Sequence, residues 1–210
     1  MSIKKIFSLA ASIINLFIIT ILIFSNSKAD ENNIKQFSAD EGVLSIMYHR
    51  FDEHKYPSTN IKMDVFLSHI KLIDDLNYKF IHPKEFNEKF DIPKKNKKIL
   101  LTIDDGLKSF YDNAWPYLKE KEIPFILFVN TREVGSFNYM NWDQITELYK
   151  SENVEIGNHS HSHEYLVEES SEDIKADIVK SINIFKDKLG ENSDFFSYPF
   201  GEYSSEFKKI

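Results

Sequence analysis

Short apolar runs recur along the chain and are separated by polar segments with turn residues. These runs are rich in Ile, Val, Leu, Phe and Tyr and cover residues 43–48, 78–81, 99–103, 125–130, 154–156 and 195–198. Runs of this length and composition are typical of strands that are buried in a sheet. The pattern predicts about six strands.

Between these runs, apolar residues return at every third or fourth position, which is the spacing of a helix with one buried face. The predicted helices cover residues 65–76, 107–121, 142–150 and 174–189. The last helix has one apolar stripe, formed by Ile174, Ile178, Ile182 and Phe185. Ser170 or Ser171 is expected to cap its start and Gly190 to end it. Pro116 is expected to bend or interrupt the second helix.

The alternation of strands and helices predicts an α/β fold with a parallel sheet or barrel. In such folds, ligand sites form where the carboxyl ends of several strands meet. Polar residues that directly follow an apolar run are therefore the first candidates for a functional site.

Two aspartates directly follow the run at residues 99–103. Asp104 and Asp105 are adjacent, and adjacent side chains of an extended strand point to opposite faces. We therefore expect the pair to lie where the strand breaks into a loop, with Gly106 providing the break. Taken alone, an Asp-Asp-Gly segment is more often an ordinary turn or a helix cap.

Three histidines follow the run at residues 154–156. His159 and His163 are four residues apart, a spacing that would place both rings on one side of a helical turn. Neutral imidazole is a common zinc ligand, and one carboxylate would complete three protein ligands and leave a position for water. A second carboxylate could take a proton from that water. The His-x-x-x-His spacing is also common on polar surfaces, so the position of both motifs after strands is what favours a metal site.

The two motifs together resemble those of the NodB-homology polysaccharide deacetylases, carbohydrate esterase family 4. The family pattern Thr-Phe-Asp-Asp-Gly is matched by residues 102–106, and His-[Ser/Thr]-x-x-His is matched by residues 159–163. The resemblance includes residues 44–49 and 196–201 and extends over most of the chain after residue 42. It implies a distorted (β/α) barrel of about seven strands and a hydrolase that removes acetyl groups from a glycan.

The resemblance also implies roles for single residues. Asp104 would be the general base. The metal would be held by Asp105, His159 and His163, and is expected to be Zn²⁺ or another divalent transition metal. The backbone N–H of Phe200 would help to stabilise the oxyanion that forms during hydrolysis.

Residues expected to bind the substrate are His49, Tyr198, Pro199 and Phe200. Aromatic rings can stack on sugars, but most aromatic residues of a small α/β domain fill its core. Of the aromatic residues, only Tyr198 and Phe200 are expected to face the site. His49 ends the first predicted strand, where it would line the cleft or have a structural role.

Three features depart from the family pattern. Ile103 replaces Phe, and Ser197 stands where the family commonly has an Arg that orients the base. The family motifs Asp-x-x-x-Trp and Leu-x-His, the second of which supplies the catalytic acid, would lie beyond residue 201. The predicted barrel is therefore incomplete at the C-terminus, and residues 42–210 are interpreted as a partial deacetylase domain.

The first residues of the chain predict export. Lys4 and Lys5 precede an apolar run over residues 6–24, and small residues follow near position 29. Residues 1–29 are interpreted as a signal peptide, or as a membrane anchor if they are not cleaved. Residues 30–41 are interpreted as a polar linker. The expected location is periplasmic or extracellular, with membrane contact only through the N-terminal segment.

The chain is acidic. Its formal charge is −7, and removal of residues 1–29, which carry three lysines and no acidic residue, leaves −10. This balance argues against nucleic acid or anionic lipid as the main partner and is compatible with a neutral or amino-bearing glycan. There is no cysteine, so stability must come from packing without disulfides.

The sequence therefore predicts an exported, zinc-dependent polysaccharide deacetylase. Its substrate would be an N-acetylated glycan such as chitooligosaccharide, peptidoglycan or an exopolysaccharide. Two alternatives use the same residues: an inactive relic that binds glycan without turnover, and an esterase that removes O-acetyl groups.

Overall fold

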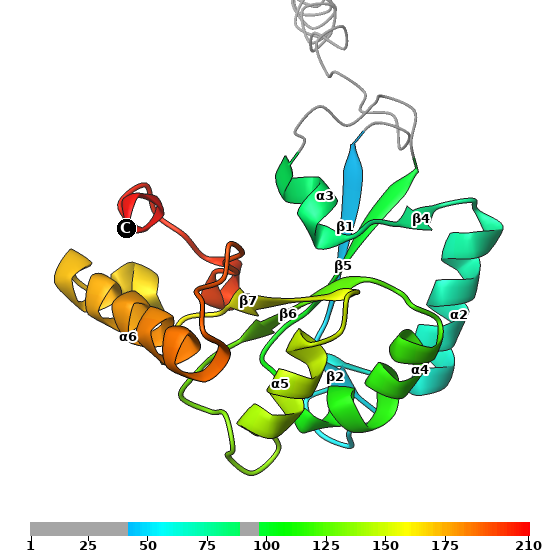
Figure 1. Cartoon of the computed structure of the whole chain (residues 1–210), viewed down its shortest axis with the longest axis horizontal. Coiled ribbons are helices and arrows are strands. Elements are labelled where there is room, and N and C mark those ends of the chain that lie inside the picture. Colours follow the sequence, from blue (N-terminus) through cyan, green and yellow to red (C-terminus); the bar gives the residue numbers. More distant parts are fainter. Residues whose placement is uncertain (1–41, 89–96) are drawn as a thin grey trace, which may run out of the picture. The chain divides into compact units, whose positions relative to one another are not determined.

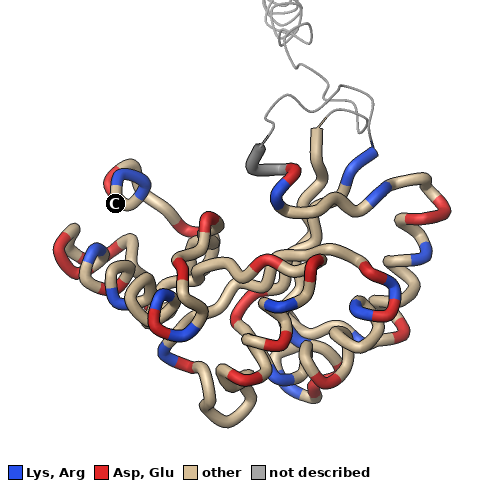
Figure 2. Tube along the Cα trace, in the orientation of Figure 1, with Lys and Arg blue, Asp and Glu red and all other residues tan. Residues whose placement is uncertain are grey.

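The computed structural model describes residues 42–88 and 97–210 (Figure 1). The predicted leader at residues 1–29 and the predicted linker at residues 30–41 lie outside this part of the chain. None of the helices in the described ranges combines the length and the apolar character needed to cross a membrane. Figure 2 shows Lys and Arg interspersed with Asp and Glu along the helices and loops.

A five-stranded parallel sheet forms the centre of the fold. Its strands are β1 (Val43–Tyr48), β4 (Lys79–Phe80), β5 (Lys98–Ile103), β6 (Phe125–Val129) and β7 (Val154–Asn158). The pairing order is β1-β5-β6-β7, and every pair is parallel. A separate parallel pair is formed by the short strands β2 (Arg50–Phe51) and β3 (Asn60–Ile61).

Strand β5 has β1 on one edge and both β4 and β6 on the other. Its whole length pairs with β1. On its other edge, Lys98 and Ile99 pair with β4, whereas Thr102 and Ile103 pair with β6. The beginning of β5 is thus held by β4 and its carboxyl end by β6, which brings the end of β5 close to the ends of β6 and β7.

Within residues 42–88 and 97–210, four α-helices lie between strands and a fifth follows the last strand. They are α2 (Met63–Asp75), α3 (Pro83–Glu88), α4 (Trp115–Glu120), α5 (Trp142–Tyr149) and α6 (Ser171–Leu189). A π-helical turn, η1 (Phe110–Ala114), precedes α4, and short 3₁₀ turns occupy η2 (Leu166–Glu168), η3 (Pro199–Gly201) and η4 (Phe207–Lys209). Helix α6 begins and ends as expected, because the Ser170 side chain accepts a hydrogen bond from Asp173 N–H and Gly190 adopts a left-handed φ of 87°.

The structure corrects two predicted elements and adds others that were not predicted. The expected helix at residues 107–121 is divided into η1 and α4, with Pro116 in the first turn of α4, where its missing N–H costs no helical bond. The expected strand at residues 195–198 is reduced to one parallel bridge between Phe196 and Asn158. Helix α3 and the β2–β3 pair were not predicted, because elements this short leave little periodicity in the sequence.

The sheet has helices packed on one of its faces. Strands β5 and β6 direct a first set of side chains into the main core: Leu101, Ile103, Phe125, Leu127 and Val129. The main core also contains side chains from α2, α4, α5 and α6, among them Phe66, Trp115, Leu148 and Phe185. The opposite face of the same strands carries a smaller cluster with Leu100, Ile126 and Phe128. Burial on both faces explains the nearly continuous apolar runs, and the arrangement confirms the predicted α/β fold with a parallel sheet.

A substitution at Gly157 in β7 would test how closely the side chains of this sheet pack. This glycine pairs with Phe128, and a Cβ atom added at Gly157 would lie 2.2 Å from Phe128 Cδ1. We predict that Gly157→Ala lowers the free energy of unfolding by about 2 kcal/mol, because the buried ring must move. Urea unfolding would measure this loss. A Phe128→Leu change should cost less in the Gly157→Ala background than in the natural sequence, and strictly additive losses would contradict the proposed clash.

Candidate metal centre

The polar residues of the site directly follow the carboxyl ends of the parallel strands. His49 follows β1, Asp104 and Asp105 follow β5, Asn130 follows β6, and His159 follows β7. Because parallel strands end on the same side, residues separated by more than a hundred positions converge there.

The aspartate pair lies in a sharp turn, as predicted. Strand β5 ends at Ile103, and both Asp105 and Gly106 have left-handed φ values, 75° and 71°. Asp104 still donates its N–H to Tyr48 O of β1, at 2.9 Å. The turn brings both carboxylates to one imidazole: His159 Nε2 lies 3.8 Å from Asp104 Oδ2 and 3.6 Å from Asp105 Oδ1. A left-handed aspartate is uncommon, and such backbone strain concentrates at functional sites.

The histidine segment is a loop, so the predicted helical turn is wrong. Ser160 and His163 have positive φ values of 68° and 54°, which a right-handed helix excludes. The two rings nevertheless meet, since the centroids of His159 and His163 lie 4.8 Å apart. Convergence was predicted correctly from the spacing, but the backbone reaches it by a different path.

Three side chains form a candidate set of ligands for a cation. One ligand atom each from Asp105, His159 and His163 lies within 4.8 Å of the others. Asp105 Oδ1 is 3.3 Å from His163 Nε2, is buried, and has no hydrogen-bond partner. A buried carboxylate oxygen without a partner is unfavourable unless a positive charge compensates it. Two imidazoles and one carboxylate are a known zinc set, so these residues fit a divalent transition metal.

His159 is oriented for this role by its second nitrogen. Its Nδ1 lies 2.8 Å from the carbonyl oxygen of Ser197. A carbonyl can only accept, so Nδ1 carries the proton, and the lone pair of Nε2 faces the carboxylates. Burial lowers the pKa of His159 to about 4, partly opposed by the hydrogen bond to Ser197. The ring is therefore neutral at physiological pH, as a metal ligand must be.

Asp104 is the more deeply buried of the two carboxylates, with 3% of its surface exposed. Burial, followed by the neighbouring charge of Asp105, raises the pKa of Asp104 to about 7. The Ser197 hydroxyl donates to Asp104 Oδ2 at 3.2 Å and acts in the opposite direction. Ser197, which stands where the resembled family has Arg, thus contacts the aspartate through a hydroxyl.

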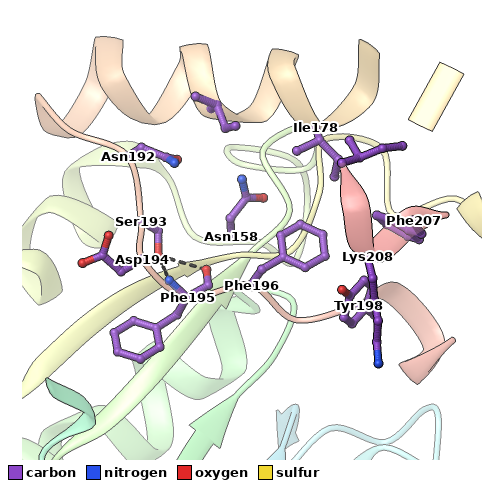
Figure 3. Close-up of a pocket in the computed structure, with 12 residues that line it drawn as sticks. Asn158, Ile178, Asn192, Ser193, Asp194, Phe195, Phe196, Tyr198, Phe207 and Lys208 are labelled. Carbon is purple, nitrogen blue, oxygen red and sulfur yellow. Dashed lines mark hydrogen bonds between the residues drawn. The ribbon is translucent and has the colours of Figure 1, made fainter. Parts of the chain in front are cut away.

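The four residues expected to bind substrate lie in different surroundings. His49 directly follows β1, and burial lowers its pKa, a shift that the charge of Asp105 opposes. Phe200 is 62% exposed, and its ring centroid lies 4.9 Å from that of His163. Pro199 is buried. The ring of Tyr198 packs against Phe196 and Phe207 (Figure 3).

Two residues near the ligands were missed by sequence reasoning. Asn130 is 1% exposed, and its Nδ2 donates to the backbone oxygen of Asp105 at 3.3 Å. Its position as the polar end of an apolar run was the available signal. Asp177, on α6, accepts hydrogen bonds from the backbone of the histidine loop. An acidic residue next to the apolar stripe of a helix was the only sign of it.

Comparisons with known proteins relate the whole domain to a family. The family model described as polysaccharide deacetylase matches residues 91–210. The chain is 25% identical to the Bacillus subtilis protein YxkH over 166 residues, which cover 78% of this chain and 58% of that protein. It is 26% identical to the poly-β-1,6-N-acetyl-D-glucosamine N-deacetylase of Staphylococcus epidermidis, over 94% of this chain and 78% of that protein.

Two solved structures have the same fold. IcaB from Ammonifex degensii superposes with a TM-score of 0.73 at 24% identity, over 80% of this chain and 78% of that one. The Streptococcus pyogenes deacetylase PplD superposes with a TM-score of 0.69 at 22% identity, over 80% and 77% of the two chains. The family model covers more than half of the sequence and includes Asp104, Asp105, His159 and His163. The chain therefore belongs to the polysaccharide deacetylase family.

Proposed function

We propose that this protein is a metal-dependent N-deacetylase that hydrolyses the acetamide groups of a polymer of N-acetylglucosamine. The observation that carries the proposal is the convergence of Asp105, His159 and His163 around a buried carboxylate oxygen without a hydrogen-bond partner. A second buried carboxylate, Asp104, lies 3.8 Å from His159. This arrangement fits hydrolysis by a water molecule that a metal ion and a base activate.

The three ligands would hold a divalent ion, with Zn²⁺ as the expected metal. When bound, the ion would supply Lewis acidity toward the acetamide carbonyl and acidify a water molecule. The protein contributes a neutral His159, whose proton is held on Nδ1 by the Ser197 carbonyl, and a carboxylate from Asp105 whose orientation is set by the left-handed turn.

Asp104 would act as the general base. It would take one proton from the water that attacks the carbonyl carbon. Return of this proton to the nitrogen, as the carbon–nitrogen bond breaks, would give a free amine and acetic acid, which ionises to acetate. Its pKa, raised to about 7, makes it a stronger base than an exposed aspartate, and a bound cation would oppose this rise. The hydrogen bond from Ser197 to Oδ2 leaves Oδ1, which has no hydrogen-bond partner, available for the water proton.

Phe200 and His49 would border the substrate. The backbone of Phe200 has φ of 59°, and its exposed ring lies against the ligand His163. Its N–H would stabilise negative charge on the carbonyl oxygen of the substrate. The exposed ring would cover one side of the sugar. Direct substrate contacts of Tyr198 and Pro199 remain predictions.

The nature of the glycan is supported by the relatives. Curated proteins from Staphylococcus epidermidis and Staphylococcus aureus that are 26% identical to this chain are named poly-β-1,6-N-acetyl-D-glucosamine N-deacetylases. We therefore propose a β-linked polymer of N-acetylglucosamine outside the cytoplasm, in line with the predicted export signal. The net negative charge of the chain suits a product that carries free amines.

Substitution of the ligands separates metal binding from chemistry. We predict that His163→Ala weakens Zn²⁺ binding by more than about 100-fold, because one of three ligands is lost. Asp104→Asn should retain Zn²⁺ and lose at least about 100-fold in turnover, because the amide cannot accept the proton. Competition with a chromophoric chelator would give the affinities. Retained turnover in Asp104→Asn would remove this residue as the base.

The bond that is hydrolysed can be tested with two substrates. We predict that the zinc-loaded protein releases acetate from β-1,6-linked N-acetylglucosamine oligomers and not from acetylxylan, because the site is proposed to act on amides. Enzymatic assay of acetate would measure both. Release from acetylxylan alone would identify an O-acetyl esterase. Binding of the oligomer without acetate release would identify a glycan-binding relic.

The burial of Asp104 predicts a pH dependence for the metal-free protein. Its pKa rises from 3.8 in the unfolded chain to about 7 in the fold, so the folded state binds more protons between these values. The resulting stabilisation is present below pH 4 and is lost as the pH rises through 7. For a pKa that rises from 3.8 to about 7, it amounts to about 4 kcal/mol. The lowered pKa of His159 acts in the opposite sense, and its main cause is burial, which Asp104→Asn retains.

We therefore expect Asp104→Asn to gain stability relative to wild type as the pH rises from 4 to 8. Urea unfolding in the presence of a chelator would measure the difference between the two proteins at each pH. A difference that does not change with pH would show that Asp104 is not perturbed as the structure indicates.

A further inference from the structure

The backbone N–H groups of the histidine loop are bound almost entirely by side chains. Ser160 N–H donates to Asn158 Oδ1 at 2.8 Å, and His163 N–H donates to Ser160 Oγ at 3.0 Å. The two N–H groups between them, those of His161 and Ser162, donate to the carboxylate of Asp177 at 2.7 and 3.0 Å. No helical ladder is formed, which explains why the loop can adopt left-handed φ values at Ser160 and His163.

Asp177 holds the middle of this loop from outside it. Each of its two oxygens accepts a hydrogen bond from one N–H, so the carboxylate fixes the orientation of two successive peptide groups. Hydrogen bonds to an ionised carboxylate are stronger than those between neutral groups. The residues it holds stand between the ligands His159 and His163, so a displacement of the loop would change the separation of the two imidazoles.

Helix α6 makes a second attachment one turn further on. Ser181, four residues after Asp177, is fully buried and lies 2.8 Å from Asn158 Nδ2. Asn158 in turn accepts from the N–H of Ser160. Residues four apart on a helix lie on the same side, so one side of α6 supplies both attachments. The loop is also held from the sheet side, where Thr131 N–H donates to Ser160 O.

We propose that Asp177 is a positioning residue for the metal centre, which sets the separation and orientation of His159 and His163 by holding the backbone between them. This inference rests on the proposed metal site but not on the substrate or on turnover. It predicts that the carboxylate of Asp177, which reaches the ligands only through the loop, controls the affinity of the site for the metal.

The test compares two aspartates of the same helix. Asp177→Asn keeps the size of the side chain but leaves one accepting oxygen for two N–H groups. Asp187→Asn is the control, because the Asp187 side chain is 71% exposed and pairs with its neighbour Lys188. We expect Zn²⁺ affinity to fall by about 10- to 100-fold in Asp177→Asn and to be unchanged in Asp187→Asn.

The visible spectrum of bound Co²⁺ gives a second readout, because its bands report the geometry of the ligands. We expect altered bands in Asp177→Asn and natural bands in Asp187→Asn. Equal Zn²⁺ affinity and an unchanged Co²⁺ spectrum in Asp177→Asn would overturn the inference while leaving the metal site intact. Failure of the wild-type protein to bind either metal would instead overturn the proposed function on which the inference rests.

Amide hydrogen exchange covers the case in which Asp177→Asn does not fold. In the wild-type protein without metal, the N–H groups of His161 and Ser162 should exchange slowly although they lie in a loop, because each is bound by Asp177. Fast exchange of both groups in a folded wild-type protein would show that the carboxylate does not hold the loop, and would overturn the inference without any substitution.

Discussion

The site depends on one buried oxygen, Oδ1 of Asp105. It faces the Nε2 atoms of His163 and His159 at 3.3 and 3.6 Å and has no hydrogen-bond partner. A carboxylate in this position is unfavourable in the protein alone and becomes favourable beside a cation. The left-handed turn at Asp105 and Gly106, which presents this oxygen, is the kind of strained backbone that persists where the surrounding fold imposes it.

The surrounding fold holds each ligand by a separate element. The ladder between β5 and β1 continues as far as Asp104 and fixes the start of the aspartate turn. The Ser197 carbonyl orients His159, and the Ser197 hydroxyl holds the proposed base. Helix α6 holds the histidine loop. A metal bound at this site would therefore connect the centre of the sheet to α6, and its affinity would report how well these elements are arranged.

The parts of the fold that sequence could predict are those with a strong local pattern. The strand at residues 43–48 was predicted at its observed bounds, and Gly190 and one of the two expected caps, Ser170, bound α6, which begins three residues before the predicted start. The path of the histidine loop could not be predicted, since it depends on hydrogen bonds to Asp177, which no local pattern indicates. The direction of the Tyr198 ring is set by contact with Phe207, and that too is not local.

X-ray absorption at the zinc edge would test the central claim most directly. For the zinc-loaded wild-type protein, the account predicts imidazole scattering from two histidines with nitrogen and oxygen ligands at about 2.0–2.1 Å. His159→Ala should lose one imidazole from the spectrum. A spectrum with oxygen ligands alone, or one that His159→Ala leaves unchanged, would contradict the proposal that Asp105, His159 and His163 form the metal centre.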